Sequence, residues 1–362
     1  MLAFLSMRGL QAVYGPALPF IQQKFGVSGE GVALVASVHF LGSAVAPLLT
    51  GVALSRFSTR RLANTGILTL LLGVILVALA HNWTLALLGA LTGGLGLGVV
   101  SAVLNTAYAS LGTRPSNAVN AVFGLGSLIS PLIVLGTAPT SLSVPFLVIA
   151  ALALLTLIAI TRWNVPEVPR EPTSSGPPVR TPVLPVLLFS VLLCTYVALE
   201  VGFGAWIAAH LGSLGWAKPA LITSAYWAGL TVGRILTRLW GQRFPARQVV
   251  LTAAATATLA ALLATFAPAL AAPAYVLAGL AAGPIFPTAL VWLTQELPSR
   301  LVPFLLVSGS VGGVISPALI GWMHSQGGPA AIPATLLVLA VLLLSVILLT
   351  TRVTRHSAIQ ST

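Results

Sequence analysis

The sequence has little charge and no aspartate. Only 6% of its 362 residues are charged, whereas 57% are hydrophobic, and the mean hydropathy is +1.02. Soluble domains carry charge on about a quarter of their residues, so this composition excludes a surface that faces water throughout. The single cysteine, Cys194, excludes an internal disulfide. The chain also lacks metal-ligand spacings, a catalytic triad and a phosphate-binding loop with lysine, so we expect no enzyme activity, no cofactor and no metal.

Apolar runs of membrane-spanning length recur along the whole chain. Each is long enough to cross about 30 Å of hydrocarbon as a helix. Lipid leaves only helices or closed barrels for the backbone, and the runs are continuous rather than alternating, which favours an all-α helical bundle. We predict twelve transmembrane helices, at 2–23, 30–54, 62–81, 84–112, 116–137, 143–162, 184–210, 218–241, 248–267, 270–295, 301–322 and 330–351.

A polar segment rich in proline and serine, residues 163–183, divides the chain into two similar halves, 1–162 and 184–362, of six predicted helices each. Three pairs of fragments recur in the same order at a nearly constant spacing, which indicates an internal repeat. An even number of spans gives both repeats the same orientation, and such proteins usually bind their solute near the midplane between repeats. The fragment pairs are LGSLISPLI (125–133) and VGGVISPAL (311–319), SRFSTRR (55–61) and QRFPARQ (242–248), and GLGLG (94–98) and GLAAG (279–283).

The basic residues lie on one side of the predicted membrane. Lys24 and Lys218 fall on the opposite side, and this asymmetry predicts that both termini are cytoplasmic. The basic side therefore faces lipid and cytoplasm rather than nucleic acid. Because arginine far exceeds lysine, we expect a bacterial inner membrane protein, and we expect a monomer. The basic-side residues are Arg56, Arg60, Arg61, Arg114, Arg162, Arg170, Arg180, Arg238, Arg243, Arg247, Arg300, Arg352 and Arg355.

The stretch GVALSRFSTRR (51–61) resembles the loop signature of the major facilitator superfamily between its second and third helices. Ser55 stands where the family has an acid, and Ser58 stands where it has a second glycine. The resemblance implies a transporter of twelve helices in which this loop acts as a conformational latch. Without an acid at Ser55 the usual carboxylate–arginine pair of the latch is lost, and the arginines also fit a simple role in membrane orientation. The matching latch residues are Gly51, Arg56, Arg60 and Arg61.

Further fragments are similar to the fucose–galactose–glucose:proton symporter branch of this superfamily. The resemblance implies a sugar-like solute, and a cavity lined by the first, fourth, seventh and tenth helices. Ser101 replaces an acid common in the fourth helix, and Asn120 replaces a histidine common in the fifth. The fragments are GLGLGVVSAVLN (94–105), NAVNAVFGLGSLISP (117–131), EVGFGAW (200–206), GRIL (233–236), GPIFPTAL (283–290) and GSVGGVISPALIGW (309–322).

Charges deep in a bilayer are costly and tend to mark functional cavities. Glu200 is the only carboxylate predicted well inside a span, so we predict that it couples transport to protons. Tyr196 precedes it by one helical turn, and Arg234 is its simplest ion-pair partner. Each polar candidate also has a structural explanation, such as pairing with a neighbouring helix, and Arg8 could snorkel to the interface. The predicted substrate-binding residues are Arg8, Gln11, Tyr14, Asn105, Asn120, Tyr196, Glu200, Trp227, Arg234, Phe286 and Trp292.

These features predict a secondary transporter that moves a small polar solute, first of all a monosaccharide, by alternating access. The coupling ion is a proton or another ion. An exporter of organic anions or drugs is the main alternative, because two deep arginines against one glutamate suit an anion, whereas an Arg–Glu pair leaves a neutral cavity. A membrane sensor that binds solute without moving it is an alternative of another class.

Overall fold

The computed structural model describes residues 1–362 except 28, 164, 169–182 and 361–362, and the described part is helical without strands. Most of the predicted linker 163–183 lies outside the described residues. The helices are α1 (Leu2–Phe25), α2 (Gly29–Ala53), α3 (Thr59–Ala78), α4 (Trp83–Ser110), α5 (Thr113–Thr137), α6 (Ser143–Arg162), α7 (Val183–Ser213), α8 (Pro219–Trp240), α9 (Ala246–Phe266), α10 (Ala271–Ala282), α11 (Ile285–Glu296), α12 (Val302–Gly327) and α13 (Ala331–Gln360), with short 3₁₀ turns at Gly241–Arg243, Pro268–Leu270 and Ser299–Leu301.

Nine helical segments within the described residues are long and apolar enough to cross a membrane, which agrees with an all-α polytopic membrane protein. The remaining three predicted spans correspond to α1, α5 and α8, which are helices of 24, 25 and 22 residues. Each of these three carries polar candidates, such as Arg8 on α1, Asn120 on α5 and Arg234 on α8. Their assignment as spans therefore stays a prediction.

The predicted tenth span, 270–295, corresponds to the apolar segment Pro268–Glu296, in which helical hydrogen bonding is interrupted. It divides into α10 and α11 at Gly283–Pro284. Proline has no backbone N–H, so Pro284 cannot donate to the carbonyl of Leu280, and Pro287 cannot donate to the carbonyl of Gly283. Two missing helical hydrogen bonds within four residues explain the break.

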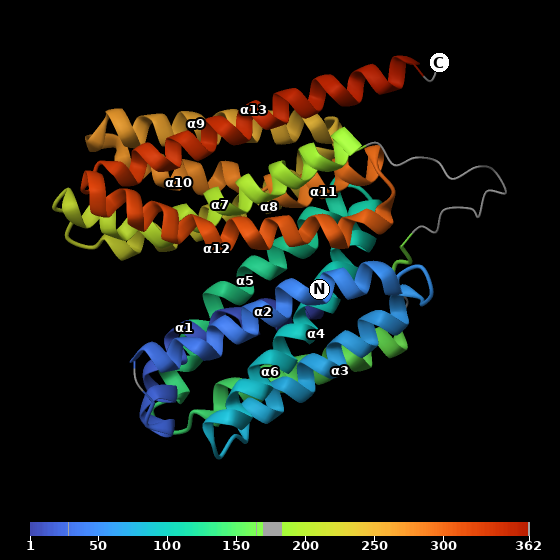
Figure 1. Cartoon of the computed structure of the whole chain (residues 1–362), viewed down its shortest axis with the longest axis vertical. Helices are drawn as coiled ribbons and strands as arrows, with labels where there is room; N and C mark the ends of the chain where they lie inside the picture. Colours follow the sequence, from blue (N-terminus) through green and yellow to red (C-terminus); the bar gives the residue numbers. More distant parts are fainter. Residues whose placement is uncertain (28, 164, 169–182, 361–362) are drawn as a thin grey trace. The chain divides into compact units, whose positions relative to one another are not determined.

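The chain forms two compact units. Unit 1 contains Met1–Tyr108 and Val122–Arg170, and unit 2 contains Ala109–Ala121 and Glu171–Thr362. In unit 1, α6 packs along both α3 and α1 (Figure 1). In unit 2, α7 packs along α12 and α13, while α10 packs along α8 and α9 (Figure 1). The end of α4 and the beginning of α5 thus belong to unit 2, although the sequence places them in the first half.

The repeated fragments make matching contacts inside their own units. Ser130 donates a hydrogen bond to the carbonyl of Gly9 on α1, and Ser316 donates one to the carbonyl of Ala198 on α7. The same shift along the chain relates Gly126 to Gly312. A side chain at Gly312 would collide with the backbone of α7, and one at Gly126 would collide with Cβ of Arg8 on α1. Small residues allow such close helix packing in lipid, where burial of apolar surface supplies little attraction.

The connection between α2 and α3 is held by the segment after α6. Ser58 caps α3 by accepting a hydrogen bond from the backbone N–H of Arg61. The carboxylate of Glu167 accepts the backbone N–H of Thr59 at 3.0 Å, and the hydroxyl of Thr59 accepts the N–H of Val168 at 2.8 Å. A carboxylate is favourable at this end of a helix because the helix dipole is positive there. Glu167 thus brings to this turn a carboxylate that position 55 lacks.

We expect Gly312→Ala to destabilise unit 2. The added methyl group would meet the carbonyl of Cys194, so α12 would have to move away from α7. Overpacking of this kind costs about 1–3 kcal/mol, which a lower apparent melting temperature of the purified protein should report. Gly136→Ala is the control, because nothing lies within 4 Å of its added carbon. Equal melting temperatures for the two variants would contradict the packing described here.

We expect Glu167→Ala to loosen the beginning of α3. Loss of the charge-assisted hydrogen bond should raise amide hydrogen exchange at Thr59 by about tenfold, since such bonds contribute roughly 1.5 kcal/mol. Hydrogen exchange followed by mass spectrometry measures this directly. Arg56→Ala is the matched control, because Arg56 is an exposed residue of the same turn. An unchanged exchange rate in the Glu167 variant would show that the carboxylate does not hold the helix end.

Candidate functional site

Two charged side chains meet inside unit 2. Glu200 lies on α7 and Arg234 lies on α8, with 3.8 Å between Oε1 of Glu200 and Nη2 of Arg234. The Arg234 side chain is 4% exposed and that of Glu200 is 17% exposed. The ion pair suggested by the sequence is therefore present. Its positive member is more deeply enclosed than its negative member, so Glu200 is the more accessible of the two.

The close packing of α8 on α10 brings Arg234 to the end of α10. Gly233 rests on the carbonyl of Leu280, and Gly283 rests on the carbonyl of Leu230, so that a side chain at either glycine would collide with backbone. The guanidinium of Arg234 consequently reaches the α10–α11 break, where its Nε donates to the carbonyl of Gly283 at 3.1 Å.

Arg234 has a further partner on α5. Its Nη1 donates to the carbonyl of Asn120 at 3.1 Å, and Asn120 belongs to unit 2. The side-chain amide of Asn120 donates to the carbonyl of Ser116, one turn earlier on the same helix. Nε, Nη1 and Nη2 of Arg234 therefore face partners at the end of α10, on α5 and on α7, respectively, and each partner is an oxygen that can accept from this cation.

Aromatic side chains surround the ion pair. The hydroxyl of Tyr196 donates to the carbonyl of Ala282, and the hydroxyl of Tyr226 donates to the carbonyl of Glu200, both at 3.0 Å. The half-buried ring of Phe286 stacks on Tyr196, with centroids 6.1 Å apart. Trp227 is also half-buried and meets the ring of Tyr226 edge-on at 5.1 Å. Phe286 and Trp227 are thus the candidate aromatic residues that keep exposed ring surface.

Trp292 lies elsewhere in unit 2. It is 1% exposed, packs edge-on against Phe189, and donates its indole N–H to Glu296 at 3.1 Å. These contacts place it in the hydrophobic core beside α7. Its enclosure favours the structural explanation over direct contact with a solute.

In unit 1, the predicted substrate-binding residue Arg8 on α1 lies near an aromatic ring. Arg8 is half-buried, donates to the side-chain oxygen of Gln11 at 2.8 Å, and lies 5.1 Å above the ring centre of Phe123. On α4, the buried side chain of Asn105 donates to both the carbonyl and the hydroxyl of Ser101. Both pairs are three or four residues apart on one helix, so each hydrogen bond stays within a single helix face.

Tyr14 forms a second buried polar group in unit 1. Its ring lies 4.9 Å from that of His39 on α2, and both residues are at most 1% exposed. The hydroxyl of Tyr14 and Nε2 of His39 have no hydrogen-bond partner among the described residues. A shift of 186 residues takes Tyr14 to Glu200, and a shift of 187 residues takes His39 to Tyr226, so the two units carry polar side chains at nearly matching positions.

The predicted latch residues lie at the α2–α3 connection of unit 1. Gly51 is buried, whereas Arg56 and Arg61 are exposed. Arg60 donates from Nη2 to the carbonyl of Thr161 near the end of α6. The side chain of Arg60 therefore reaches α6 itself.

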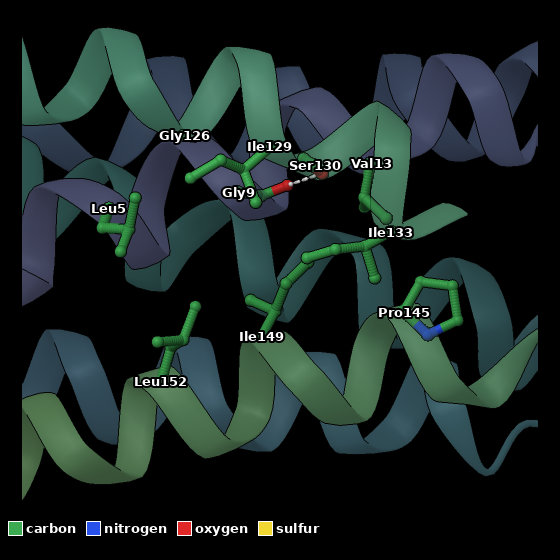
Figure 2. Close-up of a pocket in the computed structure, with 10 residues that line it drawn as sticks. All are labelled: Leu5, Gly9, Val13, Gly126, Ile129, Ser130, Ile133, Pro145, Ile149 and Leu152. Carbon is green, nitrogen blue, oxygen red and sulfur yellow. Dashed lines mark hydrogen bonds between the residues drawn. The ribbon is translucent and has the colours of Figure 1, made fainter. Parts of the chain in front are cut away.

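A small pocket of unit 1 lies among α1, α5 and α6, as Figure 2 shows. Its walls are almost entirely apolar, and the one hydroxyl there, on Ser130, already donates to the carbonyl of Gly9 (Figure 2). Such a lining offers no polar groups for a sugar or for an ion. The lining residues are Leu5, Gly9, Val13, Gly126, Ile129, Ser130, Ile133, Pro145, Ile149 and Leu152.

Sequence reasoning missed several polar contacts. Tyr226, which bonds to the backbone of Glu200, lies two turns before Arg234 on α8, and that spacing could have indicated it. His210 and Tyr275 form a buried pair at 2.6 Å between Nδ1 and the hydroxyl. No local sequence pattern predicts this pair, because His210 lies on α7 and Tyr275 lies on α10.

Known proteins resemble this chain over most of its length. The glucose/mannose transporter GlcP of Bacillus subtilis (strain 168) is 23% identical over 344 residues, which cover 86% of this chain and 84% of that protein. Among solved structures, the transporter FucP in the outward conformation has a TM-score of 0.80 at 19% identity, with 97% of both chains covered.

Two further solved structures share the fold. A variant of the Escherichia coli fucose:proton symporter FucP has a TM-score of 0.77 at 18% identity and 97% coverage of both chains. The human organic anion transporter MFSD10 has a TM-score of 0.77 at 15% identity, with 96% of this chain and 98% of that chain covered. At these identities the likeness concerns the fold alone. The family model of the Major Facilitator Superfamily matches residues 1–306, so this chain belongs to that superfamily and is a multi-pass membrane transporter rather than an enzyme.

Proposed function

We propose that the protein is a secondary transporter of a neutral, monosaccharide-like solute that works by alternating access and is coupled to protons through Glu200. The ion pair between Glu200 and Arg234 carries this proposal. A carboxylate that exchanges between a membrane-buried and a hydrated environment can take up and release a proton. The partial exposure of Glu200, against the enclosure of Arg234, supports Glu200 as the group that meets water.

The same pair supports a neutral solute over an anion. The charge of Arg234 is balanced by Glu200, and its donors are directed to the carbonyls of Gly283 and Asn120. A guanidinium engaged in this way offers little to a carboxylate of a solute. Half-buried rings such as Phe286 and Trp227 suit the apolar faces of a sugar ring instead.

Other parts of the proposal rest on the sequence. Arg8, Gln11, Tyr14 and Asn105 remain proposed polar ligands contributed by unit 1. The excess of arginine on one side supports cytoplasmic termini and a bacterial inner membrane, and we propose that the chain acts as a monomer. The arginine turn at Arg56–Arg61 is proposed as a conformational latch.

The names of two similar proteins agree with a sugar. GlcP is a glucose/mannose transporter, and one solved FucP structure is that of a fucose:proton symporter. MFSD10 is an organic anion transporter of the same fold, so the fold permits the anion alternative as well. The choice between them therefore depends on the charge balance around Arg234.

We expect Glu200→Gln to abolish accumulation of solute driven by a pH gradient while counterflow exchange continues. The glutamine imitates a protonated glutamate, and exchange requires no net proton movement. Reconstituted proteoliposomes with an imposed pH gradient and a labelled hexose measure both activities. Glu296→Gln is the control, because Glu296 lies at the end of α11, bonded to Trp292.

Continued accumulation by the Glu200 variant would reject Glu200 as the coupling residue and would favour uniport or another ion. Loss of both activities together, with an intact fold, would support the structural role of Glu200 instead. Binding of a hexose without any transport by the wild-type protein would support the sensor alternative.

We expect a hexose such as glucose, mannose or fucose to raise the melting temperature, and the matching hexuronate to have little effect. A ligand at about 100 times its Kd stabilises the folded state by about 2.7 kcal/mol. The hexose and its hexuronate differ in one charged group, so a thermal-shift titration isolates the effect of charge. Stronger stabilisation by the hexuronate would instead support an organic anion transporter.

A further inference from the structure

The α10–α11 break depends on partners from other helices. Because Pro287 has no N–H, the carbonyl of Gly283 cannot complete its helical hydrogen bond, and Arg234 donates to it instead. The carbonyl of Ala282 accepts the hydroxyl of Tyr196. Unsatisfied carbonyls inside a membrane cost several kcal/mol each, so a broken helix needs such donors.

The beginning of α5 is attached to the same break. Ser116 donates to the carbonyl of Pro287, and the side-chain amide of Asn117 donates to the hydroxyl of Thr288, both at 3.0 Å. All of these residues belong to unit 2 and are buried. Oδ1 of Asn117 is buried without a partner among the described residues, which makes this attachment less stable than its two hydrogen bonds alone suggest.

Arg234 connects both the α10–α11 break and the beginning of α5 to Glu200. It contacts the carbonyl of Asn120 on α5, the carbonyl of Gly283 at the break, and the carboxylate of Glu200 on α7. Tyr196 and Tyr226 are the other titratable groups that interact with this pair. The hydroxyl of Tyr196 donates to the carbonyl of Ala282 at the end of α10, and that of Tyr226 donates to the carbonyl of Glu200. From α11, the ring of Phe286 stacks on Tyr196.

We propose that Arg234 is a positioning residue, rather than a substrate ligand, through which the charge of Glu200 controls the attachment of the segment 113–121 to the α10–α11 break. When Glu200 takes up a proton from water, the buried guanidinium loses its counter-charge. An uncompensated buried cation is strongly unfavourable, so Arg234 shifts toward water and its two carbonyl bonds break. The inference rests on the proposed proton coupling by Glu200.

Amide hydrogen exchange of the full-length protein in lipid nanodiscs tests this proposal without solute or gradient. We expect Glu200→Gln to raise exchange about tenfold in both 113–121 and 283–289, and Arg234→Lys to do the same, because lysine cannot span two carbonyls. The double variant should add no further increase. Arg238→Lys, an exposed arginine one turn along α8, is the matched control, and exchange within α9 should not change in any variant.

Wild-type exchange in the Arg234→Lys variant, or additive effects in the double variant, would overturn the proposal. If Arg234→Lys does not fold, Glu200→Gln decides alone, because unchanged exchange at 283–289 also overturns it. Loss of proton-driven accumulation in Glu200→Gln with unchanged exchange rejects the positioning role but leaves the proposed function intact. Raised exchange with continued accumulation supports the positioning role and rejects Glu200 as the coupling residue.

Discussion

A cation buried in a membrane protein must find its counter-charge and its hydrogen-bond acceptors within the protein, and unit 2 is arranged around this requirement. Arg234 is 4% exposed, and its partners come from α5, α7 and the end of α10. These contacts require α8 and α10 to approach very closely, which Gly233 and Gly283 permit. Close glycine packing, the broken helix and the ion pair therefore depend on one another rather than being separate features of the site.

The break between α10 and α11 illustrates this dependence. A helix interrupted by Pro284 and Pro287 exposes carbonyls that lipid cannot satisfy. Arg234 and Tyr196 satisfy two of them, and Ser116 donates to the carbonyl of Pro287. Groups that would each be costly alone thus stabilise one another. Arg234 thereby links the carboxylate of Glu200 on α7 to backbone carbonyls of α5 and of the end of α10.

The two units use one packing plan with different polar residues. Ser130 donates to the backbone of α1 and Ser316 donates to the backbone of α7, with acceptors that differ by about one helical turn in position, and glycines at equivalent positions face helix backbones in both units. Yet the position of Glu200 in unit 2 is occupied by Tyr14 in unit 1, and that of Tyr226 by His39. An ancestral duplication would explain the shared packing, since the contacts of small residues tolerate little change while other polar residues can diverge.

Much of the fold follows from the sequence alone, because lipid allows only self-satisfied helices and their length is set by membrane thickness. Local spacing places Gln11 on the same helix face as Arg8, and Ser101 on the same face as Asn105, where the structure shows hydrogen bonds, since residues three or four apart share a helix face. Glu200 became a candidate from the sequence because it is the only carboxylate predicted well inside a span. Only the tertiary structure decided that Glu167 caps α3, that Trp292 lies in the core, and that Arg234 bonds to two carbonyls. These partners are distant in the chain, and which of them meet depends on how closely the helices pack, which hydropathy does not encode.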